Sequence, residues 1–258
     1  MKEIKIIFFD IDGTLIDMHH KKMSENTIKC LKALKAKGIK IVIATGRSPI
    51  SLPVFEEIEF DAFLTFNGSL CFQGDHILYH NPIPKEDVLR MIENTNKIHR
   101  PIAIATKTDL EANGYDQDLA DYYGFAHLEL KPSERFNEIL KQDIYQIMMG
   151  AYASEYDAIL EGVKGAKITA WWDRAVDIIP AGGGKGVGIE NVLKVLNLSK
   201  EESMAFGDGN NDIEMLQSVG LGVAMENASD ALKAVADDIC GHVKEDGIYH
   251  YCLKHHII

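Results

Sequence analysis

Two carboxylates, Asp10 and Asp12, directly follow an apolar run at residues 4–9. Such a run is typical of a buried strand in a parallel sheet, and open α/β sheets bind their ligands at the carboxyl ends of their strands. Burying two acids at the end of a strand is costly unless a cation pairs with them. Gly13 allows the chain to turn sharply immediately afterwards. The pattern therefore predicts a site for a divalent metal ion and, with it, a phosphate group.

Other residues suited to phosphate chemistry follow later predicted strands or lie in a linker, and each alone is a weak signal. They are Thr45 with Gly46, Lys185, Asp208, Asn211 and Asp212. A single aspartate after a strand is more often a turn or capping residue. Because the carboxyl ends of parallel strands meet at one edge of a sheet, the joint pattern is far more specific than its parts.

The carboxylates suit phosphoryl transfer. A carboxylate can attack phosphorus and form an aspartyl-phosphate if the repulsion between the two anions is reduced. Mg²⁺ would reduce it, and the side chains of Asp10 and Asp208 with the backbone carbonyl of Asp12 can supply its oxygen ligands. The side chain of Asp12 is then left to protonate the leaving oxygen and later to take a proton from water.

The remaining polar residues suit the phosphate itself. Lys185 can neutralise phosphate charge. The hydroxyl of Thr45 and the amides of Gly46 and Asn211 can donate hydrogen bonds to the phosphate oxygens. Asp212 is better placed behind these groups, where it would orient the lysine or the water around the metal.

The elements that must position these residues follow from hydrophobic periodicity. A helix is expected between Ser24 and Gly38, which suit its two ends. Strands are expected at residues 39–44, 62–66, 204–206 and 221–225. Strand, helix and strand in short succession are typical of a parallel sheet. Asn67-Gly68 is interpreted as the turn that ends the strand at 62–66 and precedes a small hairpin.

The middle of the chain follows a different pattern. Beyond the two prolines of the segment 81–84, predicted strands succeed one another without long crossovers. Such a succession indicates an antiparallel sheet with helices on one face. We therefore expect an α/β core with a Rossmann-like parallel sheet at residues 1–82 and 181–258, and an inserted α+β domain at residues 83–180.

Aromatic residues are frequent in the insertion. We expect them to pack in its interior; they are Tyr115, Tyr122, Tyr123, Trp171 and Trp172. An alternative is that some of them, with Asp173 or Arg174, form a roof that excludes water and grips the leaving group.

Composition limits the functions open to this chain. Its 258 residues carry a formal net charge of −12, which argues against non-specific binding to nucleic acid or to an anionic membrane. No segment approaches the roughly 20 apolar residues that cross a bilayer, and the amino-terminal apolar stretch is too short for a secretory signal. The four cysteines form no CxxC pair, so reduced thiols are expected. We expect a cytoplasmic monomer or small homo-oligomer that acts on a small phosphorylated metabolite.

The glycine-rich segment at residues 182–188 does not form a nucleotide-binding motif. A P-loop needs serine or threonine after its lysine, but Lys185 is followed by Gly186. A GxGxxG fingerprint lacks its third glycine in every register. We interpret these glycines as a hinge beside Lys185.

Taken together, the motifs resemble those of the haloacid dehalogenase superfamily of phosphohydrolases. The four matching segments, in the family's order, are Asp10-Ile11-Asp12-Gly13-Thr14, Thr45-Gly46-Arg47, Lys185-Gly186 and Gly207-Asp208-Gly209-Asn210-Asn211-Asp212. The insertion between the second and third segments has the position of the family's C2-type cap. Its size and strand-rich pattern resemble the C2B subgroup, the Cof-like phosphatases.

This resemblance implies roles for individual residues. Asp10 would be the nucleophile and Asp12 the general acid and base, and an acid at the second position favours phosphatase over dehalogenase activity. Mg²⁺ would be held by Asp10, the carbonyl of Asp12 and Asp208. Arg47 follows the phosphate-binding Thr45-Gly46 and would face either the substrate or a core partner. The implied activity is hydrolysis of small phosphomonoesters, either sugar phosphates or a phosphorylated cofactor.

Two other functions stay open. A phosphosugar mutase on the same scaffold would need a bisphosphate activator and would isomerise its substrate without net release of phosphate. A receiver-type signalling module also combines clustered aspartates, a threonine, a lysine and Mg²⁺, but the length of this chain and its insertion argue against it. Repeated release of phosphate would distinguish a phosphatase from both.

Overall fold

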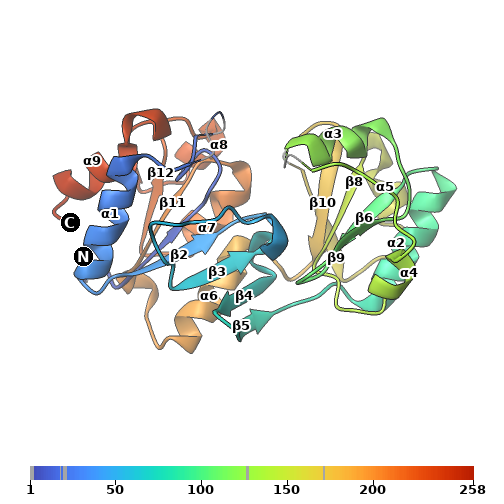
Figure 1. Ribbon diagram of the computed structural model, residues 1–258, viewed down its shortest axis with the longest axis horizontal. Helices are drawn as coiled ribbons and strands as arrows, with labels where there is room; N and C mark the ends of the chain where they lie inside the picture. The colour runs from blue at the N-terminus through green and yellow to red at the C-terminus, as the bar shows by residue number, and fades with distance from the viewer. Residues whose placement is uncertain (1–2, 18, 20–21, 126–127, 171) are drawn as a thin grey trace. The chain divides into compact units, whose positions relative to one another are not determined.

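The computed structural model describes residues 3–17, 19, 22–125, 128–170 and 172–258. Contacts between Cα atoms divide the chain into two compact units. The core unit comprises Met1–Gly46, Pro53–Tyr79 and Gly184–Ile258, and the inserted unit comprises Arg47–Leu52 and His80–Gly183. Each unit is built on one β-sheet (Figure 1).

An eight-stranded sheet forms the centre of the core unit, in the order β13-β12-β11-β1-β2-β3-β4-β5. Its strands are β1 Ile6–Phe9, β2 Lys40–Ala44, β3 Ala62–Thr65, β4 Leu70–Gln73, β5 His76–His80, β11 Ser203–Gly207, β12 Leu221–Ala224 and β13 Asp238–Ile239. Neighbouring strands from β13 to β3 are parallel, and β4 runs antiparallel to β3. The predicted Rossmann-like parallel sheet is therefore confirmed.

Strand β1 lies between β2 and β11, and the register of this trio positions the site. All four residues of β1 are fully buried, as its apolar run predicts. Phe9, the last of them, lies opposite Ile43 on β2 and Phe206 on β11. Because the three strands end side by side, the residues that follow them, including Asp10, Thr45 and Asp208, start from one edge of the sheet.

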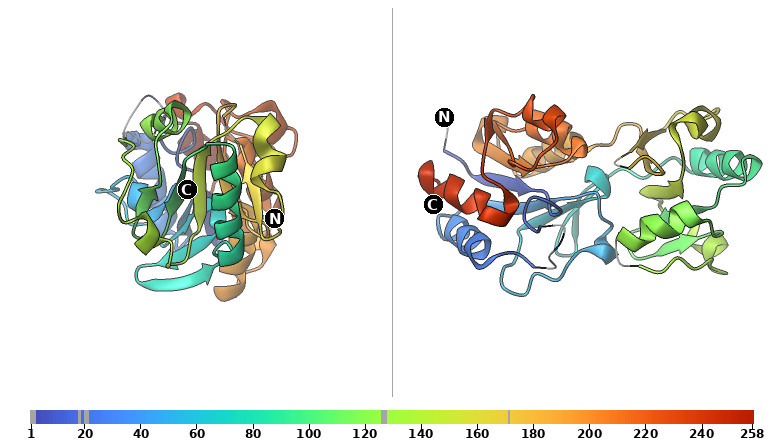
Figure 2. Two further views of the ribbon diagram at one scale, coloured as in Figure 1. Left: turned by 90° about the vertical axis from the view of Figure 1, so that its right-hand side faces the viewer. Right: turned by 90° about the horizontal axis from the view of Figure 1, so that it is seen from above.

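Helices cover both faces of the core sheet. They are α1 Glu25–Ala36, α6 Lys185–Val195, α7 Ile213–Gln217, α8 Asp230–Lys233 and α9 Gly247–Lys254. Short 3₁₀ turns add η1 Pro49–Ser51 in the inserted unit, and η2 Phe66–Gly68, η4 Lys200–Glu202, η5 Asn210–Asp212 and η6 Val243–Glu245 in the core unit. Figure 2 shows α1 and α9 on one face, with α6 and α7 on the other. Helix α1 starts where the sequence predicts, because the Ser24 side chain accepts a hydrogen bond from the backbone N–H of Thr27.

Two further expectations concern the whole chain. Within the described ranges, no helix is both long enough and apolar enough to cross a membrane. All four cysteines are buried free thiols, as their scattered spacing predicts.

The inserted unit holds a five-stranded sheet in the order β7-β6-β8-β10-β9. Its strands are β6 Ile102–Ala105, β7 Leu110–Ala112, β8 Gln146–Gly150, β9 Ala166–Thr169 and β10 Ala175–Pro180. Every neighbouring pair is antiparallel, which confirms the α+β prediction for this segment.

Helices cover both faces of this second sheet, so the prediction of helices on one face only is wrong. They are α2 Lys85–Lys97, α3 Gln117–Phe125, α4 Phe136–Ile139 and α5 Tyr156–Ile159, with η3 Ala153–Glu155 before the last. On β8, Ile147 and Met149 pack with α2, α4 and α5, whereas Met148 packs with Leu119 and Tyr123 of α3. These last two are the only buried residues of α3. A helix with so small an apolar face does not show in the sequence pattern.

Candidate active site

Three aspartates and one lysine converge beyond the carboxyl ends of β1 and β11. One carboxylate oxygen each from Asp10, Asp208 and Asp212 lies within 4.8 Å of the others. Nζ of Lys185, the first residue of α6, lies 2.6 Å from Oδ1 of Asp10 and 2.6 Å from Oδ1 of Asp212. Lys185 is 1% exposed and Asp212 fully buried. The structure thus brings together four predicted site residues from opposite ends of the chain.

Burial is the main cause of the pKa shifts in this cluster. It raises the pKa of Asp10 well above the usual carboxyl range, against the influence of Lys185 and with that of the neighbouring aspartates. Burial likewise raises the pKa of Asp208 to about 7, and the charge of Asp212 adds to the shift. For Lys185, burial alone would lower the pKa, but Asp10 and Asp212 outweigh it and raise the pKa above its usual value.

The cluster fits a divalent cation. Three carboxylates against one ammonium leave two formal negative charges in a mostly buried place, and hard divalent ions prefer carboxylate oxygens. Asp212 already uses both oxygens: Oδ1 accepts from Lys185, and Oδ2 accepts from the backbone N–H groups of Asp208 and Gly209 at 2.9 and 3.0 Å. Oδ2 of Asp10 accepts no hydrogen bond from the described part of the chain. Asp10 and Asp208 therefore offer carboxylate oxygens to a metal, whereas those of Asp212 already accept from Lys185 and the backbone.

The turn after β1 is shaped around Asp208. Gly13 has φ +86°, and a Cβ built on it would lie 2.1 Å from Oδ2 of Asp208, so only glycine fits. The hydroxyl of Thr14 donates to Oδ1 of Asp208 at 3.1 Å. Half-buried Asp12 precedes this turn and forms a backbone bridge with Ile16.

Asn227 supports the same turn, although no sequence motif marks it. Its Nδ2 donates to the carbonyl of Gly13 at 2.8 Å, and its Oδ1 accepts from the backbone N–H of Val243 at 3.0 Å. Asn227 follows the end of β12, so it carries the same signal, a polar residue beyond a parallel strand, that identifies the other site residues.

Three of the predicted phosphate-binding residues gather around Asn67. Thr45 is 1% exposed, and its backbone carbonyl accepts a hydrogen bond of 3.0 Å from the backbone N–H of Asn67. Nδ2 of Asn211 donates to Oδ1 of Asn67 at 3.2 Å. A Cβ built on Gly46 would lie 3.2 Å from that same oxygen. A residue that the sequence identifies only as a turn former is thus the common neighbour of three predicted site residues.

The remaining predicted residues belong to the inserted unit. Nη1 of Arg47 donates to the carbonyl of Ser51 at 2.9 Å, within its own loop. Tyr123 is buried in the cluster under α3, as the packing interpretation predicts, whereas Tyr115 is 58% exposed. The guanidinium carbon of Arg174 lies 4.2 Å from the ring centre of Trp172. Trp171 lies outside the described residues.

Tyr122 has a polar role, and it leads to a prediction for pH dependence. Its hydroxyl donates to Asp177 on β10, which is 4% exposed. Burial raises the pKa of Asp177 to about 6 from its ordinary 3.8, although hydrogen bonds from Tyr122 and Gln146 oppose the shift. The folded protein therefore holds this proton more tightly than the unfolded chain, so stability should fall as the pH rises from about 4 to 6 and then level off.

The variant Asp177→Asn keeps an acceptor for Tyr122 but cannot ionise. We expect it to match the wild type near pH 4 and to exceed it above pH 7 by about 2–3 kcal/mol, from roughly 1.4 kcal/mol for each pKa unit. Urea unfolding followed by tryptophan fluorescence reports on this unit, which contains both tryptophans. A stability difference that stays constant between pH 4 and 8 would contradict the prediction.

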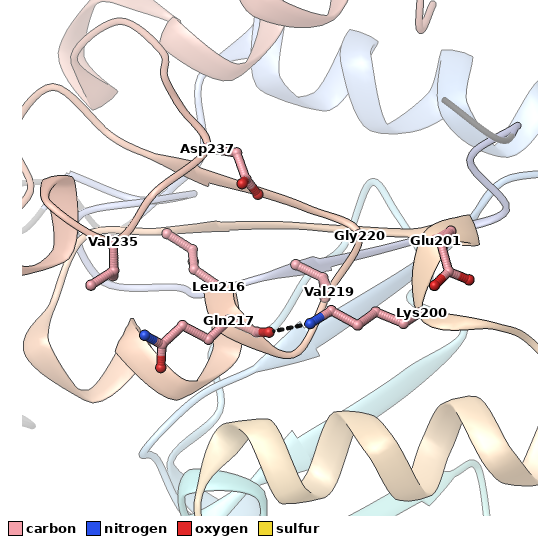
Figure 3. A pocket seen from close by; sticks show the side chains of 8 residues that line it. All are labelled: Lys200, Glu201, Leu216, Gln217, Val219, Gly220, Val235 and Asp237. Atoms are coloured by element: carbon pink, nitrogen blue, oxygen red, sulfur yellow. Dashed lines mark hydrogen bonds between the residues drawn. The ribbon is translucent and has the colours of Figure 1, made fainter.

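A pocket in the core unit lies away from this chemistry. Its lining residues are Lys200, Glu201, Leu216, Gln217, Val219, Gly220, Val235 and Asp237 (Figure 3). Lys200 and Gly220 precede β11 and β12, so the pocket is at the amino ends of these strands, whereas the aspartates follow the carboxyl ends of β1 and β11. Nζ of Lys200 donates to the carbonyl of Gln217 at 2.6 Å. The pocket is therefore separate from the candidate active site.

Comparison with known proteins agrees with this geometry. Residues 7–252 match the family model of haloacid dehalogenase-like hydrolases. YkrA of Bacillus subtilis, provisionally named a phosphatase, is 32% identical over 252 residues, covering 97% of this chain and 96% of its own. The 5-amino-6-(5-phospho-D-ribitylamino)uracil phosphatase YitU, also of B. subtilis, is 28% identical over 265 residues, covering 97% of each chain.

A solved structure extends the match to the fold. The subclass IIB sugar phosphatase BT4131 of the same superfamily superposes with a TM-score of 0.86 at 31% identity, covering 98% of this chain and 100% of the other. The match therefore covers the inserted unit as well as the parallel sheet. The chain belongs to the haloacid dehalogenase-like hydrolases, among the phosphatases of subclass IIB.

Proposed function

We propose that this protein is a Mg²⁺-dependent phosphatase that hydrolyses small phosphomonoesters through an aspartyl-phosphate on Asp10. The observation that carries the proposal is the position of Lys185, whose ammonium lies 2.6 Å from both Asp10 and Asp212. A buried lysine can keep a carboxylate in one orientation, as a nucleophile requires. An exposed ion pair at the surface would not fix the carboxylate in this way.

In the first step, a carboxylate oxygen of Asp10 attacks phosphorus and the bond from phosphorus to the ester oxygen breaks. Asp12, half-buried in the turn after β1, gives its proton to the departing oxygen. In the second step, Asp12 takes a proton from water, the water oxygen bonds to phosphorus, and the bond to Asp10 breaks. Orthophosphate is released and both aspartates return to their starting states.

The other residues bind charge and orient groups. Lys185 offsets negative charge on the phosphate, and Thr45, Gly46 and Asn211 donate hydrogen bonds to its oxygens. The metal would be held by Asp10 and Asp208 with the backbone carbonyl of Asp12. When bound, it lowers the repulsion between the nucleophile and the phosphate.

The substrate class is proposed from the relatives. One of them is named for a phosphorylated ribitylaminouracil and another is a sugar phosphatase, so both are named for small organic phosphates. We therefore propose a phosphorylated metabolite of this size, either a sugar phosphate or a cofactor-related phosphate.

A screen of phosphate release over a panel of phosphorylated metabolites tests the proposal. With Mg²⁺, we expect several turnovers per enzyme on at least one sugar phosphate or cofactor phosphate. EDTA should abolish this turnover and added Mg²⁺ should restore it, because the surplus negative charge around Asp10 would again be uncompensated. Isomerised product without net phosphate would indicate a mutase, and one phosphoryl group retained per chain would indicate a receiver.

A further inference from the structure

The β3–β4 turn contacts three of the segments that form the candidate active site. The backbone N–H of Asn67 donates to the carbonyl of Thr45, at the end of β2. Oδ1 of Asn67 accepts from Asn211, in η5. A Cβ built on the next residue, Gly68, would lie 2.5 Å from the carbonyl oxygen of Gly184, immediately before Lys185. None of the four family motifs includes this turn, although it joins their segments.

The conformation of the turn is one that its side chains rarely adopt. Phe66 has φ 53°, Asn67 φ 52° and Gly68 φ 85°, three successive residues in the left-handed region. Asparagine and glycine tolerate this region, whereas phenylalanine does so only at a cost in free energy. Such a conformation persists when the surroundings impose it, and strained turns of this kind concentrate at functional sites.

The side chain of Asn67 lies between two groups proposed to bind phosphate. The residue is 4% exposed, and its carboxamide packs against the backbone of Gly46: a Cβ built there would lie 3.2 Å from Oδ1 and 3.3 Å from Nδ2. Oδ1 is occupied by Asn211, but Nδ2 donates to no other residue in the described ranges. An N–H donor beside Gly46 that no described residue accepts is available to an anion.

We propose that Asn67 is a further phosphate-binding residue, which holds the carboxamide of Asn211 beside Gly46 and donates Nδ2–H to the bound phosphate. This inference rests on the proposed function and extends it to a fifth segment. A neutral carboxamide is suited to this position, because a carboxylate would repel the phosphate in a place where Asp10, Asp208 and Asp212 already lie together.

Two variants separate the side chain from the backbone. Asn67→Gly removes the carboxamide and tolerates φ 52°. Asn67→Asp keeps the size and an acceptor for Asn211 but puts a negative charge beside the phosphate. Asn197 provides a matched control, since it is an exposed asparagine with φ 54° outside this turn. Asn197→Gly and Asn197→Asp repeat the same chemical changes away from the site.

The readouts are the Kd of orthophosphate, measured by calorimetry in MgCl₂, and the kinetics of p-nitrophenyl phosphate hydrolysis. We expect Asn67→Gly to raise both Kd and KM about tenfold while kcat changes less than about threefold, because phosphate oxygens are held alike in the ground and transition states. Asn67→Asp should raise the Kd of orthophosphate further, by at least about a hundredfold. Both Asn197 variants should match the wild type.

Three results would each overturn a different part of these proposals. If wild-type protein releases phosphate but Asn67→Gly binds orthophosphate within twofold of it, the role of Asn67 is excluded and the proposed function stands. If Asn67→Asp binds orthophosphate as well as wild type, the carboxamide does not lie beside the phosphate. Wild-type protein that neither hydrolyses any phosphomonoester nor binds orthophosphate would overturn the proposed function itself.

Discussion

Replacing Asp10 with asparagine is expected to lower kcat/KM at least about 10³-fold, because the amide cannot attack phosphorus as a carboxylate does. The substitution keeps the size of the side chain and an oxygen that can accept from Lys185, which lies 2.6 Å away. The loss should therefore come from chemistry rather than from disruption of the site. Phosphate release with Mg²⁺, measured on the best substrate of the panel, is the readout.

The stability of Asp10→Asn provides the control. The substitution removes one of three carboxylates that surround a single lysine, so in EDTA the variant should melt no lower than the wild type. If the variant is inactive but also clearly less stable, its loss of activity would come from damage to the fold and not from the missing nucleophile. Turnover within tenfold of the wild type would rule out Asp10 as the nucleophile.

The second large effect is expected for Lys185→Met. Methionine fills a similar volume but leaves Asp10 and Asp212 without their common partner in a buried place. Removing one partner of a buried ion pair typically costs about 3–5 kcal/mol. We also expect kcat/KM to fall by about 10²–10³-fold, in the range seen when one donor is removed from a preorganised anion site. Denaturant unfolding and phosphate release measure the two effects.

A matched control lies on the same helix. Lys194 is in the last turn of α6 and is exposed, so Lys194→Met should leave activity unchanged and stability within about 0.5 kcal/mol. If Lys185→Met were as stable and as active as Lys194→Met, Lys185 would have no part in the site. Comparable losses in both variants would point instead to damage of the helix as a whole.

Local patterns explain why much of the fold follows from the sequence. A buried strand shows as a continuous apolar run, and β1 lies within the predicted run. A helix start depends on one side chain and the next few backbone groups, so Ser24 identifies the start of α1. Helix α3 was not predictable in this way, since Leu119 and Tyr123 are its only buried residues. It is stable there because a sheet formed by distant strands covers those two side chains.

The two carboxylates after β1 illustrate how much of the site the sequence determines by itself. The residue types and their order along the chain specify the chemistry, because acids, a lysine and hydroxyl or amide donors at successive strand ends suit a metal and a phosphate. The tertiary structure alone decides how they combine: Lys185 reaches Asp10 across 175 residues of sequence and Asp212 across 27. The same holds for Asn67, which the sequence shows only as a turn residue. Its contacts with Thr45, Gly46 and Asn211 depend on strand register and on packing between segments far apart in the chain, and no local pattern encodes either.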